Sequence, residues 1–157
     1  MRQVEIVEVR SRERLEQAFA IRRAVFVQEQ GVSETLEFDG RDEEARHLLA
    51  LRDGDPVGTL RLRWVEGGRV AKIERVAVLP RARGVQVGGI LIKAAVALAR
   101  TARAEVAMLH AQTVVQEFYA KLGFVAFGPE FIEDGIPHVA MRLFLRGAAA
   151  GDREGRR

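Results

Sequence analysis

The chain has 157 residues, 48% hydrophobic and 30% charged, a composition that fits one globular domain with a substantial core. It contains no cysteine, which excludes disulfides, cysteine-ligated zinc and a thiol nucleophile. The N-terminal residues lack the apolar core of a signal peptide, and no apolar run is long enough to span a bilayer, so we expect a cytoplasmic protein without a membrane partner.

The net charge of +3 is concentrated at the C-terminus. The four arginines and two acidic residues after Leu145 account for +2, which leaves +1 for the rest of the chain. That charge is too small for a nucleic-acid-binding surface, so we expect no nucleic-acid partner. Residues 147–157, rich in Gly, Ala and Arg, are predicted to form a disordered tail after a single domain that covers residues 1–146.

The first predicted elements are a strand from Val4 to Val9 and a helix that Ser11 caps. Arg14, not Glu, stands at the reciprocal position, so the capping box is incomplete. The apolar face of this helix carries Leu15, Ala18, Phe19, Val25 and Phe26. Arg22 falls on the same face, where it is either paired with an acidic side chain or part of a site.

The next segment, Gly31 to Glu44, is acidic and is predicted to be a loop with room for a short helix. Two strands, 47–52 and 57–65, are then joined by a hairpin-type turn at Asp53-Gly-Asp-Pro. Gly67-Gly68 turns the chain into a third strand, 70–79.

The stretch from Lys72 to Leu91 is the most informative part of the sequence. A β-branched strand leads through the turn Pro80-Arg-Ala-Arg-Gly into an Ala- and Leu-rich helix with Val87 and Leu91 on its apolar face. Such a turn forms an anion cradle, because free backbone N–H groups and the positive end of the helix dipole point at one spot. We therefore expect a phosphate-bearing cofactor there.

The remaining pattern predicts a strand at 106–111, a helix at 114–122 and strands at 124–127 and 138–145. Three successive hairpin strands followed by βαβ-like units imply a mixed α/β (α+β) sheet with helices on both faces.

This order of elements, with Arg81-Ala-Arg-Gly-Val-Gln-Val-Gly-Gly and Glu117-Phe-Tyr-Ala-Lys-Leu-Gly-Phe, resembles the GNAT superfamily of acyl-CoA-dependent N-acyltransferases over residues 4–145. Three further segments are similar to its ElaA/YjcF-like branch: Arg23-Ala-Val-Phe-Val-Gln-Glu-Gln-Gly, Leu109-His-Ala-Gln and Asp134-Gly-Ile-Pro-His. The resemblance implies a mostly antiparallel twisted sheet of six to seven strands and acetyl-CoA as co-substrate.

The resemblance also implies where the cofactor binds. Val76, Ala77 and Val78 would pair with the pantetheine amides, Gln112 would lie beside the pantetheine arm, and Phe118 would line the cofactor. The family loop pattern Gln/Arg-x-x-Gly-x-Gly/Ala places Arg83, Gln86 and Gly88 at its defined positions, so Gln86 replaces the first glycine and must either keep a negative φ or accept strain. The N–H groups from Val85 to Gly89 would hold the pyrophosphate. The cofactor-binding residues of the loop would be Arg83, Gly84, Val85, Gln86, Val87, Gly88 and Gly89.

Three residues are candidate catalytic groups. Tyr119, the only tyrosine, matches the family's general acid, with a ring that packs on the sheet as the alternative. Glu74 is expected on the strand face of Val76 and Val78, where it is either the base or one half of an ion pair. The backbone N–H of Val78 is the candidate oxyanion donor by the family arrangement. His110, near the end of its strand, is a candidate base or substrate ligand, and a core histidine fits equally well.

The acceptor pocket is expected between Arg22 and Asp42 and at the final hairpin, with Arg22, Phe26 and His138 as substrate-binding candidates. A cationic acceptor is suggested by the carboxylates of this region, which are Glu29, Glu34, Glu37, Asp39 and Asp42. His47 begins an inner strand beside them. A three-histidine metal site lacks a local ligand pair, so no metal is expected.

The predicted activity is transfer of an acetyl group to a primary amine of a small molecule or peptide by direct attack, since there is no cysteine to carry an acyl group. The alternative is a non-catalytic acyl-CoA-binding regulatory module. The edge strands of such a sheet are compatible with a homodimer.

Overall fold

A computed structural model describes residues 3–84 and 86–145, so the predicted tail at 147–157 lies outside the described residues. In this part of the chain the strands form one seven-stranded mixed sheet in the order β1-β2-β3-β4-β5-β7-β6. The chain divides into two compact units, Met1–Arg63 with Glu74–Ala95, and Trp64–Ile73 with Val96–Arg157. No helix in the described residues has both the length and the apolar composition that crossing a membrane would require.

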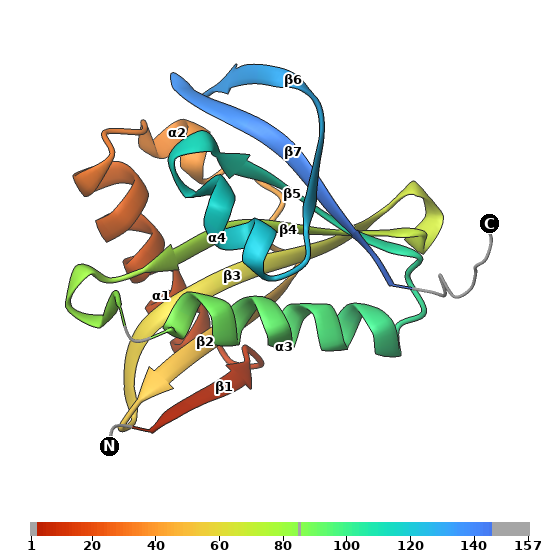
Figure 1. Cartoon of the computed structure of the whole chain (residues 1–157). Coiled ribbons are helices and arrows are strands. Elements are labelled where there is room, and N and C mark those ends of the chain that lie inside the picture. The colour runs from red at the N-terminus through yellow and green to blue at the C-terminus, as the bar shows by residue number, and fades with distance from the viewer. Residues whose placement is uncertain (1–2, 85, 146–157) are drawn as a thin grey trace. The chain divides into compact units, whose positions relative to one another are not determined.

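The first unit begins with β1 (Val4–Glu8), α1 (Arg12–Arg22), η1 (Arg23–Glu29) and α2 (Glu34–Glu37), coloured red to orange in Figure 1. Ser11 caps α1 as predicted, because its side chain accepts a hydrogen bond from the backbone N–H of Arg14. The apolar pattern expected to continue as one α-helix instead changes at Arg23 into a π-helix of seven residues. The Gln30 N–H accordingly bonds the Val25 carbonyl, five residues back, at 3.1 Å.

The hairpin of β2 (Arg46–Arg52) and β3 (Asp55–Val65) follows. Its turn consists of two residues, Asp53 (φ 53°) and Gly54 (φ 84°), and is shorter than the predicted four-residue turn. Two left-handed residues in succession match the right-handed twist of the flanking strands. β1 pairs with β2, and β2 with β3, both antiparallel.

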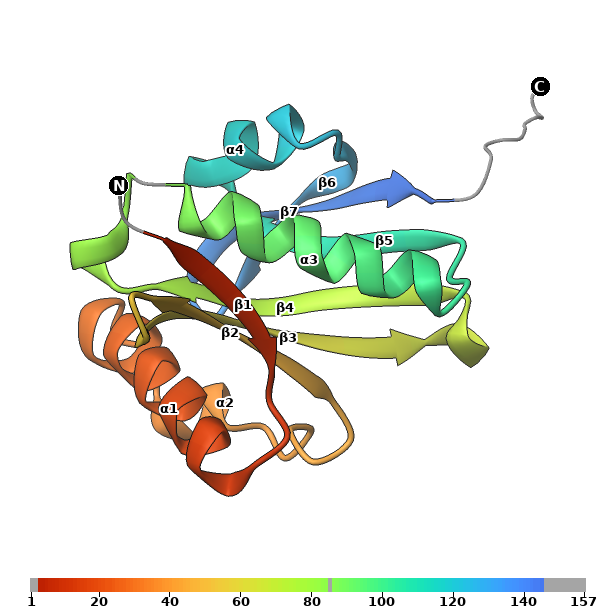
Figure 2. The ribbon, with the colours of Figure 1, turned by 90° about the horizontal axis from the view of Figure 1, so that it is seen from below.

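Helices cover both faces of this part of the sheet, as predicted and as Figure 2 shows for α1 and α3. Leu49 and Leu51 of β2 pack with α1 and η1 in a cluster that also contains Ala18, Ile21, Val25 and Ala77. Between these leucines Ala50 points to the opposite face and pairs with Gly58. A Cβ on Gly58 would approach the side chains of Leu91 and Val87 to 3.0 and 3.1 Å, so glycine permits α3 (Val87–Thr101) to lie close to β3.

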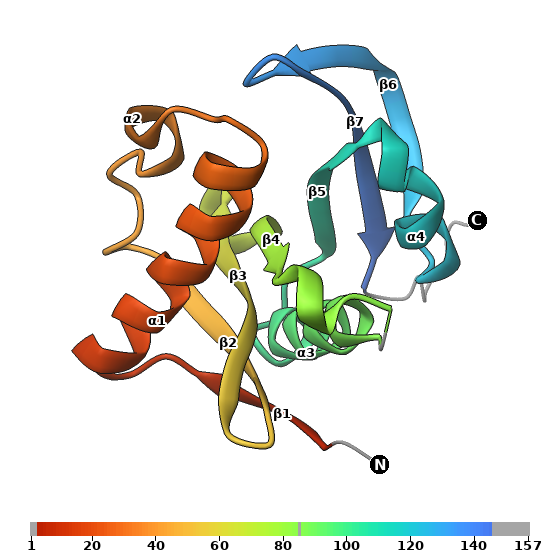
Figure 3. The ribbon, with the colours of Figure 1, turned by 90° about the vertical axis from the view of Figure 1, so that its left-hand side faces the viewer.

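The second unit contains the first half of β4 (Val70–Val78), which follows the short 3₁₀ turn η2 (Glu66–Gly68), and the strands β5 (Val106–Gln112), β6 (Val125–Glu133) and β7 (Ile136–Phe144). β4 and β5 are parallel, and β7 pairs antiparallel with both β5 and β6. After β5 the chain forms η4 (Thr113–Val115) and α4 (Gln116–Lys121). Figure 3 shows α4 beside the β6–β7 hairpin.

β6 is longer than predicted. The sequence pattern predicts the end of this strand at Phe127 because Gly128 and Pro129 follow it, but pairing resumes at Phe131 after a register shift, with Gly128 at φ 78°. The strand therefore reaches Glu133, and a two-residue turn at Asp134 (φ 53°) and Gly135 (φ 76°) leads into β7.

Candidate active site

The predicted anion cradle runs from the end of β4 through η3 (Pro80–Ala82) to the first turn of α3. The Leu79 N–H donates to the Val57 carbonyl at 2.9 Å and so ties the start of the loop to β3. Gly84 (φ 86°) and Gln86 (φ 67°) are both left-handed, and Val85 between them lies outside the described residues. Gln86 therefore has a positive φ, which strains the backbone of a residue that carries a Cβ. This is the second of the two alternatives expected from the sequence.

The first turn of α3 contains Val87, Gly88 and Gly89. A Cβ built on Gly89 would meet nothing within 4 Å, so the space beside this turn is open. The first N–H groups of an α-helix have no partner within the helix, and α3 adds the positive end of its dipole. These residues fit a phosphate-bearing group.

Arg83 holds the cradle in place through two sets of contacts. Its Nε donates to the Val78 carbonyl at 2.9 Å, and its two terminal nitrogens each donate to the Glu29 carboxylate at 2.8 Å. The hydrogen bonds from Arg83 lower the pKa of Glu29, whose charged form they stabilise. Because Glu29 ends the π-helix η1, this pair connects the loop to the segment expected to receive the acceptor.

The strand before the loop is irregular at Arg75, which has φ 57° inside β4. A left-handed residue interrupts the alternation of side chains, as in a β-bulge. The expectation that Glu74 shares a regular strand face with Val76 and Val78 is therefore wrong. Ala77 is buried, whereas Val76 and Val78 are half-buried.

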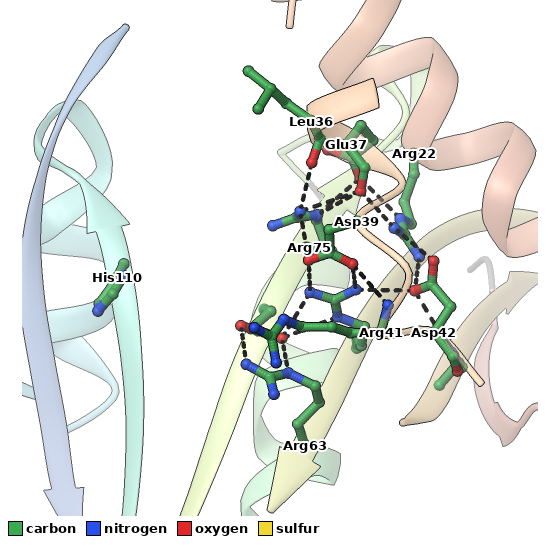
Figure 4. A network of polar contacts seen from close by, with 12 residues as sticks. Arg22, Leu36, Glu37, Asp39, Arg41, Asp42, Arg63, Arg75 and His110 are labelled. Atoms are coloured by element: carbon green, nitrogen blue, oxygen red, sulfur yellow. Dashed lines mark hydrogen bonds and ion pairs between the residues drawn. The ribbon is translucent and has the colours of Figure 1, made fainter. Parts of the chain in front are cut away.

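Glu74 belongs to a network of arginines and carboxylates within the first unit. Figure 4 shows this network around Asp39 and Asp42. Arg61, whose side chain is 1% exposed, donates to Glu74 at 3.0 Å, to Asp39 at 2.9 and 3.0 Å and to Asp42 at 3.1 Å. Arg63 binds the same Glu74 carboxylate at 2.7 and 3.1 Å. These contacts favour the ion-pair interpretation of Glu74, with Arg61 and Arg63 as its partners.

Arg22 is the second buried arginine of this network, also 1% exposed. It donates to Glu37 at 2.9 Å and to Asp42 at 2.7 Å, and it lies over the rings of Phe19 and Phe38. The contacts favour structural pairing over substrate binding for Arg22. Phe26, the other predicted substrate contact on this segment, packs against the core cluster around Val25.

The network shifts the ionisation of its members. Hydrogen bonds from Arg61 hold the pKa of Asp39 far below its usual value. Burial alone would raise the pKa of Asp42, but hydrogen bonds from Arg22 and Arg61 outweigh it and lower that pKa. For Glu37 burial prevails over Arg75 and Arg22, so its pKa is raised. Burial lowers the pKa of His47, whose Nε2 lies 3.0 Å from the Asp42 carbonyl.

The carboxylates that suggested a cationic acceptor do not form an unpaired negative surface. Each of the five has an arginine partner of its own, and the pairs are Glu29–Arg83, Glu34–Arg23, Glu37–Arg75, Asp39–Arg61 and Asp42–Arg22. Their charge is therefore balanced inside the first unit and gives no support to a cationic acceptor.

In the second unit, His110, Gln112 and His138 share one face of the sheet, because Gln112 pairs directly with His138 and His110 precedes Gln112 by two residues. His110 Nδ1 lies 2.9 Å from a carboxylate oxygen of Glu133. Sequence reasoning missed Glu133 because it ended β6 too early. The alternation Phe131-Ile132-Glu133 before the Asp134-Gly135 turn was the available signal.

Tyr119 and Phe118 lie on α4, with ring centroids 4.9 Å apart. Tyr119 is buried and also contacts Phe124 edge to face, whereas Phe118 is exposed. Burial raises the pKa of Tyr119 to about 12. Its phenol therefore stays protonated at neutral pH. In the described residues no cluster of three or more histidine, cysteine or acidic side chains is arranged to hold a metal ion.

Comparison with known proteins identifies this arrangement. Residues 8–145 match the family model described as an acetyltransferase (GNAT) domain. YjcF of Bacillus subtilis, an N-acetyltransferase by its description, is 38% identical over 133 residues, 84% of this chain and 94% of the relative.

Two solved structures are similar along most of this chain. The structure of an acyl-CoA N-acyltransferase from Pseudomonas aeruginosa is 31% identical, with a TM-score of 0.79, and covers 90% of this chain and 99% of that one. Escherichia coli ElaA is 27% identical, with a TM-score of 0.80 and the same coverage. These matches confirm the resemblance inferred from the sequence motifs.

Proposed function

Because the chain belongs to the GNAT family of acetyltransferases, we propose that it transfers an acetyl group from acetyl-CoA to a primary amine of a small molecule or peptide by direct attack in a ternary complex. The family is one of acyl-CoA N-acyltransferases, so the protein is a transferase enzyme. The observation that carries the proposal is the family match across residues 8–145, which includes the strand, loop and helix of the cradle.

Acetyl-CoA is the proposed co-substrate. A GNAT family acetyltransferase from Elizabethkingia anophelis, which shares the fold with a TM-score of 0.73 at 15% identity, was crystallised with acetyl-CoA bound. In this chain, N–H groups of residues 85–89 would hold the pyrophosphate, supported by the open space beside Gly89 and the dipole of α3. The backbone of Val76, Ala77 and Val78 would pair with the pantetheine amides, and Gln112 and Phe118 would line the arm.

The chemical step needs a free amine, a polarised thioester carbonyl and a proton for the departing sulfur. The Val78 N–H would polarise the carbonyl in the family arrangement. Tyr119 would donate a hydrogen bond to the sulfur, since a phenol with a pKa of about 12 is protonated at every pH at which the enzyme can be assayed. A thiol has a pKa of about 8.5, so complete transfer of the Tyr119 proton to a free thiolate would be unfavourable by about 3.5 pKa units. The phenol must therefore donate to the sulfur while the C–S bond breaks.

The proposal is tested by release of CoA thiol from acetyl-CoA across a panel of primary amines. The absence of cysteine removes any protein background from a thiol-reactive dye. We expect amine-dependent release by the wild type and about 100-fold lower turnover in Tyr119→Phe at similar acetyl-CoA affinity. An enzyme that binds acetyl-CoA but acylates no amine would instead be the non-catalytic binding module.

A further inference from the structure

A histidine and a carboxylate face each other in the second unit. His110 lies on β5, and Glu133 is the last residue of β6, with 2.9 Å between Nδ1 and Oε1. The Phe131 ring meets His110 edge to face at 4.9 Å and stacks on His138 at 5.9 Å. The register places these side chains on one face of the sheet, because Phe131 pairs with His138 and Glu133 follows it by two residues.

The contact determines which nitrogen of His110 is protonated. The hydrogen bond from His110 lowers the pKa of Glu133, so this carboxylate is ionised at neutral pH and can only accept. Nδ1 must therefore carry the hydrogen, which leaves a lone pair on Nε2 of the neutral ring. Within the described part of the second unit Nε2 has no hydrogen-bond partner, and the side chain is 26% exposed.

Three other charged or titratable groups of this unit face the pair. Lys72 on β4 and His138 on β7 both act on the Glu133 charge. The Nδ1 of His138 donates to the Ile136 carbonyl at 2.7 Å, so this imidazole has its own fixed tautomer. Arg142 on β7 is held over the rings of Phe127 and Phe144. Lys72 and His138 therefore favour an ionised Glu133, the state that fixes the tautomer of His110.

We propose that His110 is the base that removes a proton from the acceptor amine, and that Glu133 is a positioning residue that keeps Nε2 of His110 free to accept it. The inference rests on the proposed function, because a protonated amine acceptor requires such a base. Glu74, the other candidate base, is bound by Arg61 and Arg63, which leaves His110 as the better base of the two.

The base would act before the C–N bond forms. A primary ammonium, whose pKa is about 10.4, loses one proton to Nε2 of His110. The amine lone pair forms the C–N bond with the thioester carbonyl carbon, and the C–S bond breaks. The second N–H proton ends on the CoA sulfur, and His110 returns the first to water.

The first test measures the tautomer directly by imidazole ¹⁵N–¹H NMR of the whole protein above neutral pH. We expect His110 to carry its hydrogen on Nδ1 in the wild type and to change to Nε2 in Glu133→Ala. The control is Glu130→Ala, which removes the same charge from an exposed position on the same strand. A hydrogen on Nε2 in the wild type, or no change in Glu133→Ala, would overturn the inference.

The second test separates a base from a structural residue by the choice of acceptor. A primary alkylamine must be deprotonated, whereas an alkoxyamine of equal length is already neutral at the assay pH. We expect His110→Gln to lower kcat/KM about 100-fold for the alkylamine and less than about 5-fold for the alkoxyamine, with a smaller loss of the same kind in Glu133→Ala. Equal losses for both acceptors would refute a base.

The two proposals fail in different ways. Wild-type protein that releases no thiol with any amine contradicts the proposed function. An active wild type in which Glu133→Ala behaves like Glu130→Ala in both tests contradicts the role of Glu133 and leaves the proposed function intact.

Discussion

Replacing Arg61 with methionine isolates the contribution of the buried ion network. Methionine keeps an unbranched apolar chain but removes a guanidinium that is 1% exposed and contacts Asp39, Asp42 and Glu74. Three carboxylates would lose a shared cation, and two of them, Asp42 and Glu74, are themselves nearly buried, at 12% and 10% exposure. Because the network joins the acidic loop to β3 and β4, the change should destabilise the fold.

The expected cost follows from this burial. Removing one partner of a buried ion pair costs about 3–5 kcal/mol. Arg22, Arg63 and Arg75 still contact the three carboxylates after the change, but the network is left with one excess negative charge that is largely buried. In a chain of this length about 4 kcal/mol corresponds to a drop in Tm of roughly 10 °C. Arg63→Met is the matched control, since Arg63 contacts only Glu74 of this network and is more exposed, at 14%. We expect it to cost about 1 kcal/mol.

Urea unfolding followed by circular dichroism at pH 7 and near pH 3 supplies the assay. The pKa values of Asp39 and Asp42 are lowered in the fold, so their stabilisation is present above their unfolded pKa of about 3.9 and is lost as the pH falls through the folded values. The raised pKa of Glu37 has the opposite effect on the free energy of unfolding, because burial disfavours its ionised form in the fold.

The difference in the free energy of unfolding between wild type and Arg61→Met should therefore be smaller near pH 3 than at pH 7. Equal destabilisation by Arg61→Met and Arg63→Met, or a difference that widens as the pH falls, would refute the reasoning.

Three further predictions concern the anion cradle and the proposed general acid, Tyr119. Gln86→Gly relieves a left-handed residue and should raise the free energy of unfolding by about 0.5–1 kcal/mol, measured by urea; a loss of stability would show that the side chain compensates for the strain. The activity deficit of Tyr119→Phe should be constant from pH 7 to pH 10, because a phenol with a pKa of about 12 does not titrate there; a deficit that vanishes at pH 9 would contradict it. Arg83→Ala and Glu29→Ala should each weaken acetyl-CoA binding in calorimetry, with a coupling of about 0.5–1 kcal/mol in a double-mutant cycle. Additive effects would contradict the idea that the Arg83–Glu29 pair holds the cradle in place.

Local patterns explain why most of the fold was predictable. The cap at Ser11, the hairpin turn at Asp53-Gly54 and the strand, loop and helix around Gly84 each depend on residues close together in sequence. The π-helix from Arg23 to Glu29 was not predictable, since its apolar residues also fit α-helical spacing.

The site was harder to predict from the sequence than the fold, because its contacts join residues that are distant in the sequence. Arg61 meets Asp39 across 22 positions, and His110 meets Glu133 across 23. No periodicity in one sequence identifies such partners. The left-handed Arg75 inside β4 likewise has no local signal, since arginine is not a residue that favours positive φ.

Titration calorimetry of acetyl-CoA with wild type and Gly88→Val tests the central claim most directly. Gly88 is the second residue of α3, and valine has a better helix propensity than glycine, so the helix itself should survive the change. Thr101→Val, at the other end of the same helix, is the control. The account predicts tight binding by the wild type and by Thr101→Val, and at least tenfold weaker binding by a folded Gly88→Val. Unchanged affinity in Gly88→Val would contradict the placement of the cofactor at this turn.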